Sequence, residues 1–249
     1  MNQIIIGGGE VGYSLHQLLG EKIPVVDTNI KRSIQTALIS DDIDIMHICF
    51  PHGRQFKKIV MNYFNQYEPK MIVIHSTVPV GTTYSIQTLV GRPTVIYAPT
   101  RGVHSRFVKD MKRYTKLWAS AEPITDFDRH AFNIVWGDAG VKTEQWNDVK
   151  DLELAKVLID TTYYGWLISF RFLSDSIAEH YGADKEKIWD FADEIQDILG
   201  NRPRMFSNVD GIGGHCVLPN LELNNDKWSD YMENIINVIN SAHRKKRVD

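Results

Sequence analysis

The residue best suited to covalent chemistry is Cys216, which ends the glycine-dense run GIGGHC at residues 211–216. Glycines let a backbone approach a ligand closely. A thiol becomes a nucleophile only as a thiolate, which nearby cations or the amides of such a turn favour. With His215 beside it, Cys216 is a candidate reactive centre. The local sequence equally allows a free cysteine that packs as a small apolar group, so the rest of the chain has to decide.

Three further polar residues share one face of a predicted helix. From Asp148 onward the apolar residues follow a helical pattern, and Lys156, Asp160 and Tyr164 recur within it at four-residue spacing. An exposed Lys–Asp pair would contribute only a few tenths of a kcal/mol. Large apolar and aromatic residues flank the face, however, and a desolvated lysine is a common catalytic amine. Spacing alone leaves both interpretations of Lys156 open.

A dinucleotide-binding turn is predicted at the start of the chain. Residues 3–6 are apolar and strand-like, residues 7–12 form G-x-G-x-x-G, and helical spacing follows. A second predicted strand, Ile23 to Val26, ends at Asp27, whose carboxylate can accept hydrogen bonds from an adenosine ribose. Free amides at the helix start favour a pyrophosphate. The expected cofactor contacts are Gly7, Gly9, Glu10, Val11, Gly12 and Asp27. Since Asp27 would repel a 2′-phosphate, NAD is favoured over NADP, although Lys31 and Arg32 lie close in sequence.

The elements that must position these residues alternate between strand and helix. This order predicts an α/β fold, with a Rossmann-type parallel sheet and helices on both of its faces, in residues 1–147. A helical domain in residues 148–249 would carry Lys156 and Cys216. The further strands are expected at 43–50, 71–74, 94–97, 116–119 and, as an edge strand, 141–145. Helices are expected at 56–64, through residues 86–89, at 127–135 and at 183–199. Ligands of such sheets lie at the carboxyl ends of the strands, where Pro51, Ser76, Thr77 and Arg101 fall.

Three motifs together resemble the UDP-glucose/GDP-mannose dehydrogenase family, the nucleotide-sugar 6-dehydrogenases. They are STVPVGTT at residues 76–83, the E-x-x-K of residues 153–156, and GIGGHC. The resemblance implies that Lys156 stabilises oxyanionic intermediates, and that Cys216 forms a thiohemiacetal and then a thioester. Ser76 and Thr77 would offer hydroxyls near the cofactor, with Thr77 in the catalytic set. Arg101, His104, Tyr164 and His215 are the candidate substrate contacts.

The chain departs from the family pattern at several positions. The family has Asn four residues after its lysine and Asp four residues after its cysteine, whereas Asp160 and Asn220 stand there. If the two side chains meet, the exchanged pair keeps one carboxylate and one amide in the site. The glutamate that helps to hydrolyse the thioester is replaced by Thr100, and His104 could serve as a base instead. The sequence also corresponds to a shortened form without the C-terminal nucleotide-sugar domain.

Composition limits the classes of partner. A net charge of −3 gives no general attraction to nucleic acid or to a membrane surface. No apolar run approaches the roughly 18 residues of a membrane span, and no signal-type segment begins the chain. The two cysteines, Cys49 and Cys216, lie in different contexts and fit a reducing compartment. We therefore expect a cytoplasmic protein with a small-molecule substrate, and no Cys and His spacing predicts a metal site.

These observations predict an NAD-dependent oxidoreductase that oxidises a primary alcohol, for example of a sugar or nucleotide-sugar, through an intermediate linked to Cys216. Oxidation by only two electrons stays open because the hydrolytic glutamate is missing. The alternative is a non-redox or sensor protein that binds a nucleotide or metabolite on a retained Rossmann fold. The predicted long helix at residues 151–181 has more apolar surface than a small domain can cover, which predicts a homodimer.

Overall fold

The computed structural model describes residues 1–34 and 42–199. The chain divides into two compact units, residues 1–156 and residues 157–249. Helix α6 (Val149–Val157), which carries Lys156, therefore belongs mainly to the first unit, whereas the sequence placed the boundary after residue 147. Among the described helices, none combines the length and the apolar character that crossing a membrane would require.

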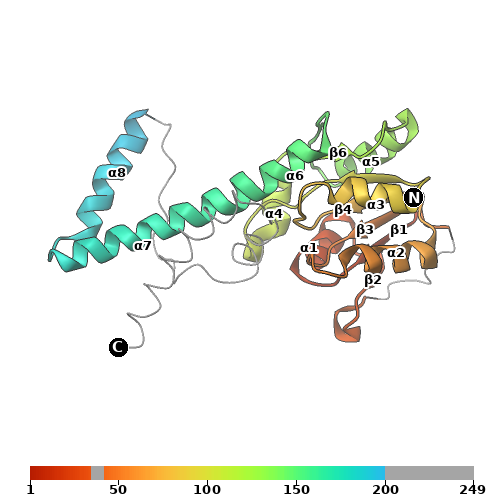
Figure 1. Ribbon diagram of the computed structural model, residues 1–249, viewed down its shortest axis with the longest axis horizontal. Coiled ribbons are helices and arrows are strands. Elements are labelled where there is room, and N and C mark those ends of the chain that lie inside the picture. The colour runs from red at the N-terminus through yellow and green to blue at the C-terminus, as the bar shows by residue number, and fades with distance from the viewer. Residues whose placement is uncertain (35–41, 200–249) are drawn as a thin grey trace. The chain divides into compact units, whose positions relative to one another are not determined.

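The first unit is built on a seven-stranded sheet with the order β2-β1-β3-β4-β5-β6-β7 (Figure 1). The strands are β1 (Gln3–Ile6), β2 (Val25–Val26), β3 (Ile45–Ile48), β4 (Met71–Ile74), β5 (Thr94–Tyr97), β6 (Lys116–Ser120) and β7 (Thr143–Gln145). The helices are α1 (Glu10–Leu19), α2 (Phe56–Tyr67), α3 (Thr82–Val90), α4 (Phe107–Arg113) and α5 (Asp126–Asp138), followed by α6. Two short 3₁₀ turns, η1 (Ile30–Arg32) and η2 (His104–Arg106), lie in the connections.

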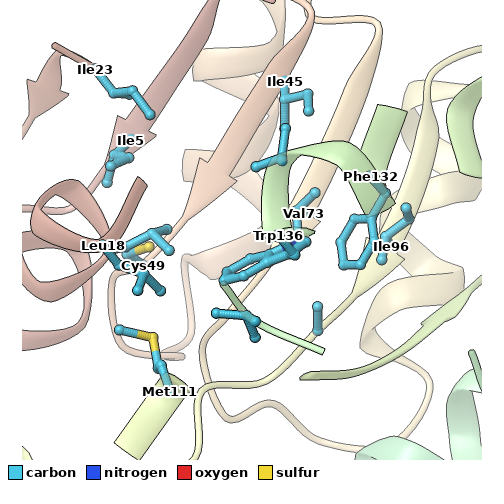
Figure 2. Close-up of a cluster of buried hydrophobic side chains, with 14 of the residues drawn as sticks. Ile5, Leu18, Ile23, Ile45, Cys49, Val73, Ile96, Met111, Phe132 and Trp136 are labelled. Carbon is cyan, nitrogen blue, oxygen red and sulfur yellow. The ribbon is translucent and has the colours of Figure 1, made fainter. Parts of the chain in front are cut away.

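Helices cover both faces of this sheet because each central strand is apolar on both sides. Alternate residues of a strand point to opposite faces, and strands buried on both faces become continuous apolar runs, such as MIVI in β4. One face packs against α1, α4 and α5, where Trp136 of α5, at 0% exposure, and Val73 of β4 belong to one buried cluster (Figure 2). The other face packs against α2, α3 and α6. The result is three layers.

The predicted fold class is confirmed, and so are the bounds of β4 and β5. Two details differ. Strand β6 runs antiparallel to β5, with Ile96 opposite Ser120, whereas a wholly parallel sheet was expected. Helix α4 and both 3₁₀ turns were not predicted. Helix α4 connects β5 to β6 in the sequence. Strand β6 begins beside the carboxyl end of β5, so it pairs with β5 in the opposite direction.

The central strands end at one level. Ile48 is the register partner of both Ile6 and Ile74, and Ile74 is the partner of Tyr97. The residues that follow β1, β3, β4 and β5 therefore share one edge of the sheet, as the sequence predicted. Strand β6 starts at this same edge because it is antiparallel.

The described part of the second unit consists of the π-helix η3 (Leu158–Tyr163), α7 (Tyr164–His180) and α8 (Lys185–Leu199). The pair of helices is joined by polar contacts. The Arg171 guanidinium lies 3.1 Å from Asp175 and 4.5 Å from the ring centroid of Trp189. The Trp189 indole donates to Asp175 at 2.8 Å. Large apolar side chains, among them Phe170 and Ile177, are about half exposed along α7.

Candidate active site

The glycine turn after β1 has the local geometry that a pyrophosphate needs. Gly7 has φ of +101°, and a Cβ there would lie 2.8 Å from Phe50 N. A Cβ on Gly12 would lie 1.8 Å from Gly7 O, so this glycine allows α1 to pack closely on the turn. A Cβ on Gly9, in contrast, would meet nothing within 4 Å. Gly9 is also the N-cap of α1 and has no side chain that could cap the first turn, so the positive end of the helix dipole faces this open space.

Asp27 lies where the sequence placed it, directly after β2. Its Oδ2 accepts a hydrogen bond from Gly8 N at 2.7 Å and its Oδ1 accepts one from Asn29 N at 2.7 Å. A carboxylate has about four acceptor positions, so these bonds fix its orientation and leave capacity for ribose hydroxyls. The donor set and the open space at Gly9 therefore fit a dinucleotide.

A hydrogen bond from the Ser76 side chain connects the segments that follow β3 and β4. The Ser76 hydroxyl donates to Phe50 O at 2.6 Å, and the residue is 8% exposed. Its hydroxyl thus fixes the loop that continues into Pro51, and the cofactor contact expected from Ser76 would have to come from its backbone. Thr77 is half-buried and Pro51 is exposed at the same edge, as are Glu10 and, partly, Val11 beside the glycine turn.

Glu153 connects two of the sequence motifs. It is fully buried and accepts hydrogen bonds from Gly81 N (2.6 Å), Thr83 N (2.9 Å) and the Thr83 hydroxyl (2.6 Å). It therefore caps the start of α3, where a negative charge is favoured by the helix dipole. Burial raises the pKa of Glu153, and the hydrogen bonds from Thr83 and Gly81 oppose that shift. The sequence alone predicts no role for the glutamate of the E-x-x-K motif, and the structure shows that it connects α6 to the start of α3.

Lys156 lies one turn of α6 beyond Glu153. Its Nζ donates to Thr100 O at 2.8 Å, which places the amine at the carboxyl end of β5. The Thr100 hydroxyl is buried, and within residues 1–34 and 42–199 it has no hydrogen-bond partner. Arg101 follows, with its guanidinium 4.9 Å from the ring centroid of Tyr114. An amine, a hydroxyl and a guanidinium thus occupy one short stretch of the sheet edge.

A buried polar chain, which sequence reasoning missed, runs under α5. His47 Nδ1 lies 3.0 Å from His75 Nε2, and His47 Nε2 lies 2.9 Å from the side-chain amide of Gln3. Lys116 Nζ lies 3.1 Å from His75 Nδ1 and 4.6 Å from the ring centroid of Trp136. Burial lowers the pKa of Lys116 to about 7 and that of His47 to about 3. The signal in the sequence was a histidine within the apolar run of β3 and another directly after the apolar run of β4.

The buried surroundings of Cys49 make its thiol unreactive. It is 6% exposed beside Leu18 (Figure 2), and burial raises the pKa of its thiol to about 12. A thiol that stays protonated is neither a nucleophile nor a good metal ligand. In the described ranges, no cluster of three or more His, Cys, Asp or Glu side chains could hold a metal ion.

The remaining predicted site residues belong to other segments of the chain. Asp160 and Tyr164 belong to the second unit, where the π-helix η3 replaces the α-helix that was expected from residue 148 onward. A π-helix has a wider turn, so the four-residue spacing from Lys156 no longer marks one α-helical face; such segments are frequent at functional sites. His104 begins η2. His215, Cys216 and Asn220 lie outside the described residues.

Comparison with known proteins gives a match by structure alone. No protein-family model matches the chain, and no curated protein matches it. A UDP-D-ManNAc dehydrogenase from Pyrococcus horikoshii superposes with a TM-score of 0.78 at 15% identity, over 97% of this chain and 68% of its own. The UDP-N-acetyl-mannosamine dehydrogenase Cap5O from Staphylococcus aureus gives 0.72 at 15% identity, over 100% and 69%. The chain has the fold of these dehydrogenases.

A dehydrogenase of another substrate has the same architecture. The 3-hydroxyisobutyrate dehydrogenase of Mycobacterium tuberculosis, solved with L-serine, gives a TM-score of 0.65 at 13% identity, over 98% of this chain and 95% of its own. The expected resemblance is therefore confirmed for the fold. A shared fold serves several chemistries, so the activity has to be argued from the residues of the site.

Proposed function

We propose that the protein is an NAD-dependent oxidoreductase that oxidises a primary alcohol of a small molecule, with sugars and nucleotide-sugars as the substrate class. The observation that carries this proposal is the Lys156 amine, which binds Thr100 O at 2.8 Å on the sheet edge where the glycine turn also opens. The dehydrogenases of similar fold act, by their names, on UDP-sugars and on a hydroxy acid. NAD+, when bound, supplies the hydride acceptor.

The residues of the glycine turn and Asp27 would bind the cofactor. The amides at the start of α1 and the helix dipole favour the pyrophosphate, and the open space at Gly9 lets it approach. Asp27 would accept hydrogen bonds from the ribose, and its charge disfavours a 2′-phosphate, which supports NAD over NADP. Thr77 offers a half-buried hydroxyl at the end of β4.

The substrate would be bound and activated by residues on both sides of Lys156 in the sequence. The Lys156 ammonium would stabilise the oxygen that becomes negative as the alcohol is deprotonated, and Asp160 would accept the proton, with Asn220 as a further polar contact. Cys216, next to His215, would add through its thiolate to the aldehyde carbon and form a thiohemiacetal.

Arg101 suits a phosphate or carboxylate of the substrate because its planar guanidinium binds such groups bidentately. His104 and Tyr164 complete the proposed substrate contacts, and a homodimer through residues 151–181 would cover the exposed apolar side chains of α7.

The decisive experiment follows NADH formation with a panel of UDP-sugars and small hydroxy acids. Lys156→Met should lower kcat by about a hundredfold to a thousandfold, since it removes a charge that acts on the developing oxyanion, while Lys150→Met in the same helix should leave kcat unchanged. Cys216→Ser should block turnover and leave the Kd for NAD+ intact. Unchanged turnover in Cys216→Ser would remove the cysteine from the mechanism. Binding of NAD+ without oxidation of any alcohol in the panel would refute the enzyme and favour a sensor.

A further inference from the structure

The loop that follows β5 is held on both sides of Arg101. Directly before Arg101, the Thr100 carbonyl accepts a hydrogen bond from Lys156 Nζ at 2.8 Å. Two residues after it, Val103 N donates to Asp110 Oδ2 of α4 at 2.9 Å. The backbone of Arg101 is therefore fixed at the carboxyl edge of the sheet, next to the carbonyl that binds the Lys156 amine.

Further contacts restrain the same loop. Pro99 O accepts a hydrogen bond from Lys116 Nζ at 3.2 Å. Gly102 has φ of +132°, and a Cβ there would lie 2.6 Å from Asp110 Cβ. Asp110 is 2% exposed, and its Oδ2 lies 3.1 Å from Arg106 Nε, so this carboxylate pairs with Arg106. The loop thus lies so close to α4 that any side chain at position 102 would displace it.

Tyr114 holds the side chain of Arg101. It lies four residues after Asp110, a spacing that puts both residues on one face of a helix. Tyr114 is the C-cap of α4, and its N–H donates to Asp110 O at 2.9 Å. The Arg101 Cζ lies over the Tyr114 ring, 4.9 Å from its centroid. Since β6 begins two residues later at the carboxyl end of β5, the ring and the guanidinium belong to this edge of the sheet.

This arrangement suits the recognition of an anion. A cation over an aromatic face is attracted by the ring itself and needs no oxygen acceptor for that contact. A guanidinium that is already restrained loses less side-chain freedom when a ligand binds, and its planar N–H groups match two oxygens of a carboxylate or phosphate. The Lys156 amine, bound to the residue directly before Arg101, adds a second positive charge at the same place. Two neighbouring cations favour a negatively charged ligand.

We propose that Arg101 selects acidic substrates by binding a carboxylate or phosphate of the molecule whose alcohol group meets Lys156, and that Tyr114 is the positioning residue that holds the guanidinium for this contact. The role of Lys156 rests on the proposed function. Thr100 and Arg101 are consecutive, with Cα atoms about 3.8 Å apart, so one small molecule can contact both the amine and the guanidinium. A neutral alcohol lacks the group that Arg101 binds.

The test is arginine-selective labelling of the full-length protein with phenylglyoxal, with and without NAD+. Mass spectrometry gives the labelling of Arg101 relative to the exposed Arg92, which precedes β5 at the opposite edge of the sheet. Inorganic phosphate, glycolate and UDP are the anionic probes, and ethylene glycol is the neutral one. A bound anion protects the guanidinium by mass action, so the ratio should fall about threefold once a probe reaches twice its Kd.

The probes distinguish the sources of the anionic group. Protection by glycolate indicates a carboxylate, protection by inorganic phosphate indicates a phosphate, and protection by UDP alone indicates a nucleoside diphosphate; each supports the proposal. Ethylene glycol should leave the ratio unchanged. An equal ratio with and without all three anions would overturn the proposal, as would equal protection by ethylene glycol.

Variants test the role of Tyr114. Tyr114→Leu should raise the Kd of the protecting anion by about two- to fivefold, the range of an exposed cation–π contact, whereas Tyr114→Phe keeps the ring and should protect as the wild type does. Phe127→Leu, at an exposed aromatic residue of α5, is the control that should leave the Kd unchanged. In turnover, Tyr114→Leu should raise the KM of an acidic substrate by more than it lowers kcat. An unchanged Kd in Tyr114→Leu, or an equal loss of protection in Tyr114→Phe, would overturn the positioning role.

The labelling requires no turnover. Protection of Arg101 by an anion without oxidation of any alcohol would contradict only the proposed function, whereas turnover without protection of Arg101 would contradict only this inference.

Discussion

Replacing Lys116 with methionine should change how the stability of the first unit depends on pH. The unfolded lysine has a pKa of 10.5 and the folded one a pKa of about 7. Between these values the unfolded chain binds a proton that the folded chain does not, so the free energy of unfolding rises with pH. One pKa unit corresponds to about 1.36 kcal/mol, and the folded lysine is still half protonated at pH 7, so the wild-type protein should gain about 2.3 kcal/mol between pH 7 and pH 9 relative to Lys116→Met.

Comparison with the variant isolates this effect from other titrations. His47 has its pKa lowered to about 3 and destabilises the fold as pH falls below 6.5, whereas Cys49 has its pKa raised to about 12 and destabilises the fold as pH rises above 9. Both groups remain in the variant and cancel in the difference. Methionine also leaves Pro99 O without its donor, which costs about 1–2 kcal/mol at every pH.

Hydrogen exchange of peptides from β3 and β4 measures this quantity for the first unit alone. The opening free energy of both proteins would be determined at pH 6, 7, 8 and 9, with Lys112→Met as the control that should follow the wild type. The reasoning would be refuted if the difference between wild type and Lys116→Met stayed constant within about 0.5 kcal/mol over this range, the usual additivity error for independent sites. Such a constant difference would show that the folded protein keeps Lys116 charged, as the unfolded chain does over this range.

Three further predictions concern single residues. Asp27→Asn should raise the Kd for NAD+ by about tenfold or more and reduce the preference for NAD+ over NADP+, because a charged acceptor for the ribose is lost. Calorimetry with both cofactors would measure the two Kd values, and an unchanged ratio between them would contradict the prediction. Glu153→Gln should lower the free energy of unfolding by about 1–3 kcal/mol, since its NH₂ cannot accept all three hydrogen bonds, as urea titration would measure, with the exposed Glu68→Gln as a neutral control. Cys49 should resist iodoacetamide at pH 8 in the folded protein, where its pKa of about 12 leaves almost no thiolate, and should react once the chain is unfolded in urea; labelling of the folded protein at this position would refute its burial.

Local sequence signals predicted the parts of the site that depend on backbone chemistry. The spacing of Gly7, Gly9 and Gly12, followed by a strand that ends at Asp27, predicted a turn and a carboxylate that the structure places 2.7 Å from Gly8 N. Strand positions such as Met71–Ile74 followed from apolar runs bounded by turn residues. These features are short-range, so a single stretch of sequence contains all of the information.

Features that arise from contacts between distant residues were not predicted. Periodicity cannot distinguish a parallel strand from an antiparallel one, so the direction of β6 depends on how α4 packs. The apolar spacing in the π-helix η3 is close to that of an α-helix, so the sequence pattern does not distinguish the two. Lys116 begins a strand and resembles an ordinary exposed end residue until His75, 41 positions earlier in the chain, is brought within 3.1 Å of it.

The contact of Glu153 with the start of α3 affects when the Lys156 segment loses its conformational freedom. Because one carboxylate joins the helix of Lys156 to the start of α3, the backbone that carries the amine is held beside the loop after β4 before any ligand arrives. The conformational freedom of that amine is lost once, when the chain folds, and need not be lost again on each encounter with a substrate. A chain organised in this way recognises its ligands with a surface that is already shaped.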